Sequence, residues 1–310
     1  MMDKEGGGKF GHKGGISGIF FILIAGACWG SIGIFVRKFN SLGLVSMDIV
    51  AVRSVFTAVF MAAFLAVYDR SLLKIRLRDI WCFAGTGIVS MVFFNYCYFG
   101  LIRISSLSVA AVMLYTAPAF VMLLSAVIFH ERITAVKVAA LVLTFVGCCF
   151  VTGVVGSRVH LTGRAILLGL GAGLGYALYS IFGRFALMRG YHSFTINLYT
   201  FLFASLACIP LVDAGKIFTV CTSNLSMAVF SVLCGLVTTM VPYIAYNFGL
   251  AGVETGKAAI IASIEPVVAT LIGAALFGER PGVGNIIGII LVLAAIVLCN
   301  LKIDIFTGEL

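Results

Sequence analysis

The amino-acid sequence predicts an all-α integral membrane protein with ten transmembrane helices, arranged as two inverted five-helix repeats. Three observations predict this class: the apolar composition, the division of the chain into long apolar runs, and an internal repeat. Of the 310 residues, 62% are hydrophobic and 11% are charged, and the mean hydropathy is +1.16. Soluble domains carry about 25% charged residues. Because a soluble protein could not cover so many apolar side chains, we expect lipid to surround this one.

The apolar runs set the predicted helices. A transmembrane helix needs about 20 apolar residues, and charged or turn-forming residues divide the chain into ten such runs. The predicted helices are 15–36, 46–68, 80–99, 106–129, 134–155, 164–187, 193–212, 225–249, 256–277 and 283–301. The connections are short, and none is long enough to form a soluble domain.

Lysine and arginine set the predicted orientation. Lys4, Lys9 and Lys13 precede the first apolar run, as in a signal anchor that stays in the membrane as the first helix. With a cytoplasmic N-terminus, the first five helices place nine Lys or Arg inside and three outside, whereas the second five place four on each side. Since cytoplasmic loops carry the excess positive charge, we predict a multi-pass plasma (inner) membrane protein with both termini cytoplasmic. The net charge of +9 then needs no nucleic acid, whose binding would require a clustered basic face.

The second half of the chain repeats the first. FFNYCYFGL near residue 93 resembles PYIAYNFGL near residue 242, and separated matches all lie 147 to 149 residues apart. The matches are Phe99-Gly100-Leu101 with Phe248-Gly249-Leu250, Pro118 with Pro266, Glu131-Arg132 with Glu279-Arg280, Trp29 with Tyr176, and Arg37 with Arg184. Each copy holds five helices, so the second enters the membrane from the opposite side. We therefore predict two inverted units, residues 1–155 and 156–310, as secondary transporters have.

Three segments resemble a known family. SIEPVVATLIGAALFGERP is similar to the ninth helix of EamA-type proteins of the drug/metabolite transporter superfamily, APAFVMLLSAVIFHER is its first-half relative, and AGACWGSIGIFVRKF is similar to the first helix. The resemblance covers about residues 16 to 301. It implies ten helices around a central cavity and the export or exchange of a small organic solute. It does not imply one substrate.

Glu265 is the carboxylate that these boundaries place deep in a helix. Its first-half counterpart is Ala117, whereas the adjacent Pro266 is matched by Pro118. A charge at a helix centre costs roughly 2.5–3.5 kcal/mol on insertion scales, so we expect Glu265 to face the bundle interior. It is either a proton-coupling or substrate-binding group or a structural carboxyl. Each proline frees the carbonyl four residues earlier, which predicts a hinge or broken helix beside the cavity, with a static kink as the alternative.

Aromatic and amide side chains gather on matched helix faces, because residues three or four apart lie on one side of a helix. Such a set suits a cavity that stacks on an apolar or aromatic solute and offers a few hydrogen bonds. The alternative for each residue is helix packing or an interfacial position. The candidates for substrate binding, with Glu265, are Trp29, Asn95, Tyr98, Tyr115, Tyr176, Tyr179, Tyr243, Tyr246 and Asn247.

Three further features carry open alternatives. Arg53 follows Asp48 by five residues, which favours a structural pair or an arginine that reaches toward the membrane surface, with recognition of a substrate anion as the alternative. Glu131-Arg132 and Glu279-Arg280 end their helices, where arginine complements the helix dipole; a gating ion pair is the alternative. The pairs Gly26/Gly30 and Gly171/Gly175 predict close helix approach.

The predicted function is a secondary transporter that moves a small organic metabolite across the membrane by alternating access. The resemblance favours an amino acid or related compound and export. Membrane lipid is the other predicted partner, and no oligomeric state is predicted. No Cys or His cluster has metal-ligand spacing, and no GK[ST] follows the glycines near 170, so we predict no metal, no cofactor and no ATP-driven pump.

Two other classes remain. An intramembrane lipid-modifying enzyme would need paired acids or a His-rich or Asp-rich motif at one membrane face, and the four histidines are scattered. We therefore predict no catalytic residues. A channel or scaffold is less favoured, because an inverted repeat serves alternating access and neither of these functions requires it.

Overall fold

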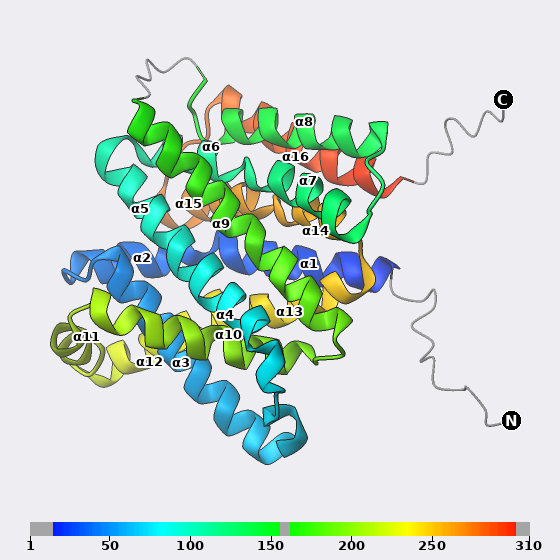
Figure 1. Cartoon of the computed structure of the whole chain (residues 1–310). Helices are drawn as coiled ribbons and strands as arrows, with labels where there is room; N and C mark the ends of the chain where they lie inside the picture. Colours follow the sequence, from blue (N-terminus) through cyan, green and yellow to red (C-terminus); the bar gives the residue numbers. More distant parts are fainter. Residues whose placement is uncertain (1–14, 156–161, 302–310) are drawn as a thin grey trace, which may run out of the picture.

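The computed structural model describes residues 15–155 and 162–301, and all regular structure in these ranges is helical (Figure 1). The first half contains α1 (Gly15–Gly30), α2 (Ile32–Ser41), α3 (Ser46–Tyr68), η1 (Arg70–Leu73), η2 (Leu77–Asp79), α4 (Ile80–Ala84), η3 (Gly85–Val92), α5 (Phe93–Ile104), α6 (Leu107–Leu114), α7 (Ala117–Phe129) and α8 (Ala135–Val151). The second half contains α9 (Gly163–Met188), α10 (Ser193–Cys208), η4 (Ile209–Leu211), α11 (Ala214–Cys221), α12 (Leu225–Gly235), η5 (Leu236–Met240), α13 (Val241–Gly252), α14 (Thr255–Ala262), α15 (Glu265–Phe277) and α16 (Val283–Asn300).

Within the described residues, nine continuous stretches are long and apolar enough to cross a membrane, and α8 is a shorter apolar helix. These ten elements confirm the predicted class. The first stretch runs to Ser41 rather than 36, and the third covers Leu77–Ile104 rather than 80–99. Charged residues did not end these helices, because long side chains near a membrane surface reach polar partners while their backbone stays helical.

Helix α11 was not predicted. It begins after Asp213, whose side chain accepts a hydrogen bond from the Lys216 backbone N–H at 3.0 Å, a helix N-cap. It packs against α3 and α12. We call the end of the bundle where α11 lies the α11 end. The opposite end, where α1 begins and α16 finishes, we call the terminal end (Figure 1).

The two halves are interlocked. Helix α1 packs against α13, α14 and α15 of the second half, and α9 packs in the same way against η3, α5, α6 and α7 of the first. The second helices of the two halves, α3 and α10, pack together, as do the fifth helices α8 and α16 (Figure 1). Since the first helix of each half lies on the third and fourth helices of the other, the centre of the bundle is built jointly.

Both fourth helices are broken. Helix α6 ends at Leu114 and α7 begins at Ala117, while α14 ends at Ala262 and α15 begins at Glu265. Pro118 and Pro266 occupy the first turn of the new helix, where proline is tolerated because that turn has free N–H groups. The prolines therefore start a second helix after a two-residue turn, which is a larger interruption than a kink.

Glycine lets the first helix of each half reach the break in the other half. A Cβ added to Gly26 would lie 2.4 Å from Ile264 Cγ2 and 2.9 Å from the Ala262 carbonyl oxygen. Gly173, its counterpart, lies against Thr116 and the Met113 carbonyl in the same way. Glycine is required at both positions, because the helix that carries it packs directly against the backbone of the broken helix in the other half.

The third helix of each half contains a π-helical stretch, η3 and η5. Thr86 on η3 shares a 2.6 Å hydrogen bond with Thr200 on α10, and Thr239 on η5 shares one of 2.5 Å with Thr57 on α3. Wider π turns occur as local bulges in α-helices, often at functional sites. Here they accompany buried hydroxyl pairs that link the two halves inside the apolar bundle.

Candidate solute-binding site

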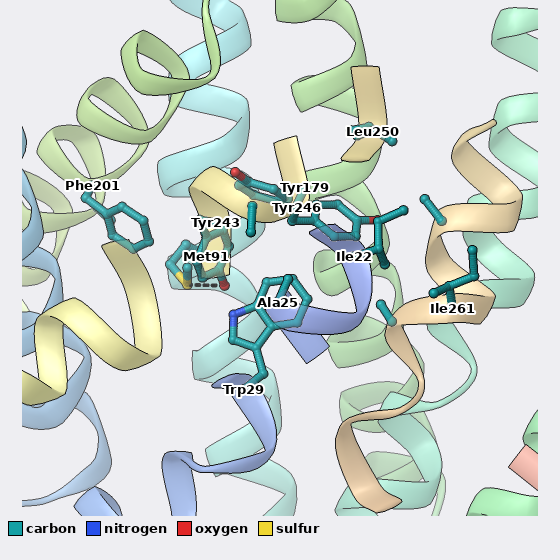
Figure 2. Close-up of a cluster of buried hydrophobic side chains, with 14 of the residues drawn as sticks. Ile22, Ala25, Trp29, Met91, Tyr179, Phe201, Tyr243, Tyr246, Leu250 and Ile261 are labelled. Carbon is teal, nitrogen blue, oxygen red and sulfur yellow. Dashed lines mark hydrogen bonds between the residues drawn. The ribbon is translucent and has the colours of Figure 1, made fainter. Parts of the chain in front are cut away.

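An aromatic cluster lies where α1, α9 and α13 meet. The ring of Trp29 lies 5.1 Å from that of Tyr243 and 5.4 Å from that of Tyr246, measured between centroids. Tyr179 adds an edge-on contact to Tyr243 at 4.8 Å. Figure 2 shows Trp29, Tyr179, Tyr243 and Tyr246 converging from the three helices. Edge-to-face pairs of this kind favour a rigid arrangement, so the cluster presents a defined apolar surface.

Polar groups fix most of these rings. Tyr246 shares a 2.8 Å hydrogen bond with Ser180, and Tyr179 accepts one from the Asn247 amide at 2.9 Å. The Tyr243 hydroxyl contacts the Met91 sulfur at 3.8 Å (Figure 2). Among the described residues, the indole N–H of Trp29 is buried without a hydrogen-bond partner. A buried donor without a partner is unfavourable, so this group offers a contact to a polar solute atom.

Glu265 is the first residue of α15, directly after the second helix break. The helix N-terminus favours a negative charge, which explains how the chain tolerates a carboxylate there. The Tyr176 hydroxyl lies 3.4 Å from the carboxylate, a long contact. The carboxylate therefore keeps capacity to accept further hydrogen bonds.

Two narrow cavities meet at this place, and Tyr176, Ser180 and Tyr246 line both. Each has a volume of about 20 Å³. A water molecule needs about 10–15 Å³ of such volume, so the cavities must widen to take an organic solute. Side chains from both helix breaks line the first cavity, including Tyr115, Pro118, Ser263 and Glu265.

A larger cavity of about 370 Å³ opens at the α11 end. We call it the vestibule. Its lining comes from the α2–α3 connection and the end of α5: Asn40, Gly43, Leu44, Val45, Ser46, Met47, Phe99, Ile102 and Arg103. The vestibule thus lies at the α11 end, and its lining shares no residue with the two narrow cavities.

The structure gathers most of the predicted candidates around the narrow cavities. The predicted residues that line these cavities are Trp29, Tyr115, Pro118, Tyr176, Tyr179, Tyr243, Tyr246 and Glu265. Asn95 instead donates to the Met91 carbonyl on its own helix at 2.7 Å, Tyr98 packs beside Phe94, and Asn247 reaches the cluster only through Tyr179. Pro266 is buried next to Glu265.

Several lining residues were not predicted: Ser90, Met91, Phe94, Ser180 and Ser263. Ser180 follows Tyr176 by four residues, so helical spacing could have identified it. The others carried no such signal, because serine and methionine are equally common in helix packing. Within residues 15–155 and 162–301, no group of three His, Cys, Asp or Glu side chains could hold a metal ion.

The expected pair between Arg53 and Asp48 does not form. The Asp48 carboxylate accepts the Val45 backbone N–H at 2.9 Å and so caps α3. Arg53 lies at 6% exposure, and in the part of the chain that the structure describes it has no ion-pair partner. The capping bond fixes Asp48 at the first turn, away from a residue that lies more than one turn further along.

The two Glu-Arg motifs link helices in different ways. The Glu131 carboxylate accepts hydrogen bonds from the backbone N–H groups of Thr255 and Gly256, at 2.7 and 3.1 Å. Glu279 forms an ion pair with Arg37, whose guanidinium also lies over the ring of Phe277. The glutamates thus make the contacts between halves. His130 and Gly278, one residue earlier, have left-handed backbones that end α7 and α15.

These features define a class: a ten-helix membrane transporter with two inverted repeats. The model of the EamA-like transporter family matches this chain twice, over residues 16–153 and over residues 163–301. The chain belongs to the EamA-like transporter family.

The chain is also similar in sequence to two transporters and in fold to a protein of known structure. The chain is 26% identical over 284 residues to the uncharacterized transporter YxxF of Bacillus subtilis, covering 89% of this chain and 87% of the relative. It is 28% identical over 287 residues to an uncharacterized transporter of Archaeoglobus fulgidus, covering 89% and 94%. A protein of known crystal structure superposes with a TM-score of 0.75 at 15% identity, covering 91% of this chain and 96% of that one, which shows a shared fold.

Proposed function

We propose that the protein is a secondary transporter that moves a small organic solute, an amino acid or related compound, by alternating access. The observation that carries this proposal is that Glu265, at one of the paired helix breaks, and the aromatic cluster line neighbouring cavities where the two halves meet. Inverted halves that share a central site can rock about it and expose it to one membrane face at a time. The prolines at the breaks supply the hinges.

The proposed direction is export across the plasma membrane. The Lys/Arg distribution supports cytoplasmic termini. With that orientation the vestibule at the α11 end faces outside and the terminal end faces the cytoplasm. The vestibule is then on the side of the membrane to which an exported solute would be released.

Counterflow in proteoliposomes tests the carrier mechanism. A thermal-shift screen against amino acids, nucleosides and cationic drugs first identifies binders, since a ligand at 100 times its Kd stabilises the folded state by about 2.7 kcal/mol. Vesicles preloaded with the unlabelled binder should then take up the labelled binder faster than empty vesicles. Equal uptake in both would indicate a channel and overturn the proposal.

Proton coupling through Glu265 is part of the proposal. Glu265→Gln keeps the size and one acceptor oxygen but cannot ionise. We expect an imposed pH gradient to drive uphill flux in the parent protein and to lose this effect in Glu265→Gln. Asp213→Asn, at the start of α11, is the matched control and should keep the gradient response. Flux in Glu265→Gln that still follows the gradient would exclude this coupling role.

A further inference from the structure

Matched residues are bonded differently at the two ends of the bundle. At the terminal end Glu131 caps α14 at Thr255 and Gly256, and Thr255 is fully buried. The residues matched to that helix start, 148 positions earlier, are Leu107 and Ser108 on α6. Glu279 does not cap them, and Leu107 is 64% exposed. The glutamate cap is therefore formed at the terminal end, and its equivalent at the α11 end is not.

The matched arginines differ in the same sense. At the terminal end Arg184 donates to the Leu250 carbonyl oxygen, which ties α9 to the end of α13. Its counterpart Arg37 would reach the matching carbonyl of Leu101 on α5, but pairs with Glu279 instead. The glutamate cap and the arginine–carbonyl bond are thus both formed at the terminal end, and the equivalent residues at the α11 end do not form them.

We infer that the two ends exchange these contacts during the transport cycle. In the opposite conformation Glu279 caps α6 at Leu107 and Ser108, and Arg37 bonds the Leu101 carbonyl. Glu131 then leaves α14 and pairs with Arg184, as Glu279 pairs with Arg37 here. Two inverted copies of one sequence have two equivalent packings, and conformational changes of transporters run between such discrete arrangements.

Thiol labelling of purified protein tests the exchange without any solute. Thr255→Cys reports the terminal end and Leu107→Cys the α11 end, with labelling by maleimide measured per site by mass spectrometry. Glu131→Ala should raise the labelling rate at Cys in position 255 and lower it at position 107, each by several-fold. Glu279→Ala should shift both rates in the reverse directions. Arg132→Ala, an exposed neighbour without an ion pair among the described residues, should leave both unchanged.

If both glutamate variants change the labelling rates in the same direction, the exchange is overturned. Such a result would indicate that the two glutamates make independent structural contacts. Should either alanine variant fail to fold, Glu131→Gln and Glu279→Gln keep one acceptor oxygen and should give smaller shifts of the same opposite signs. Labelling does not depend on transport, so this result is independent of the proposed function.

Discussion

At the scale of single residues, the site depends on which side chains are small as much as on which are polar. Gly26 allows α1 to lie directly against the break between α14 and α15, and so brings Trp29, three residues later, beside the cavities. A larger residue would push α1 away from the carbonyl of Ala262. The position of the aromatic cluster thus depends on the absence of a side chain at Gly26.

We therefore expect Gly26→Ala to destabilise the folded protein by about 1–3 kcal/mol, as overpacking does. Gly33→Ala is the matched control, because a Cβ there meets no atom within 4 Å, and it should be neutral or stabilising by up to about 1 kcal/mol. Thermal denaturation in detergent measures both. Equal midpoints for the two variants would contradict the close approach.

At the scale of elements, each half contributes one broken helix and one helix with a π-helical stretch. Both interruptions occur where a helix meets the other half: the breaks contact α1 and α9, and the π-helical stretches contact α3 and α10. Interruptions of the backbone in a membrane are tolerated where they are buried in protein or line a cavity. The elements at the centre are therefore irregular because both halves shape them.

The threonine pair between α3 and η5 gives a test at this scale. The hydroxyls of Thr57 and Thr239 lie 2.5 Å apart and also contact the Gly235 carbonyl. A double-mutant cycle with Thr57→Val and Thr239→Val should show a coupling of about 0.6 kcal/mol, up to about 1.7, typical of hydrogen bonds inside membrane proteins. Thr57→Val combined with Thr200→Val, which do not share a bond, should be additive. Additivity in the first pair would exclude the bond.

At the scale of the whole molecule, the contact between Glu131 and the start of α14 joins the halves outside the membrane-spanning segments. Burial raises the pKa of this carboxyl, but hydrogen bonds from Thr255 and Gly256 to the ionised form outweigh it, and the pKa is lowered. A lowered folded-state pKa means that the contact stabilises the protein above the unfolded pKa, about 4.3 for glutamate. The stabilisation is lost as the pH falls through the folded value.

The difference in unfolding free energy between the parent protein and Glu131→Gln should therefore be constant between about pH 6 and 8 and shrink as the pH drops below about 4.3. Urea denaturation in detergent at several pH values measures it. Arg132→Gln serves as the control, since arginine stays charged throughout this range. A difference that grows toward low pH would show that the carboxyl is not held in its ionised form.

The sequence alone determined the elements and their symmetry. Apolar runs predicted the ten helices, because a backbone in lipid must satisfy its own hydrogen bonds as a helix. The matched prolines located both breaks, because proline cannot continue a helix without loss of a bond. Helical spacing also placed Tyr176 and Tyr179 on one face with Tyr243 and Tyr246 expected nearby.

Only the tertiary structure decided which of these faces meet. The sequence favoured a pair between Arg53 and Asp48, yet Asp48 caps its own helix, and Arg53 forms no ion pair in the described part of the chain. It placed Asn95 in the site, but that side chain donates a hydrogen bond to the Met91 carbonyl, four residues earlier. The packing of the two halves against each other depends on contacts between residues far apart in the sequence, such as Glu131 with Thr255, 124 positions later. Periodicity describes one helix at a time, whereas such contacts depend on how all ten pack together.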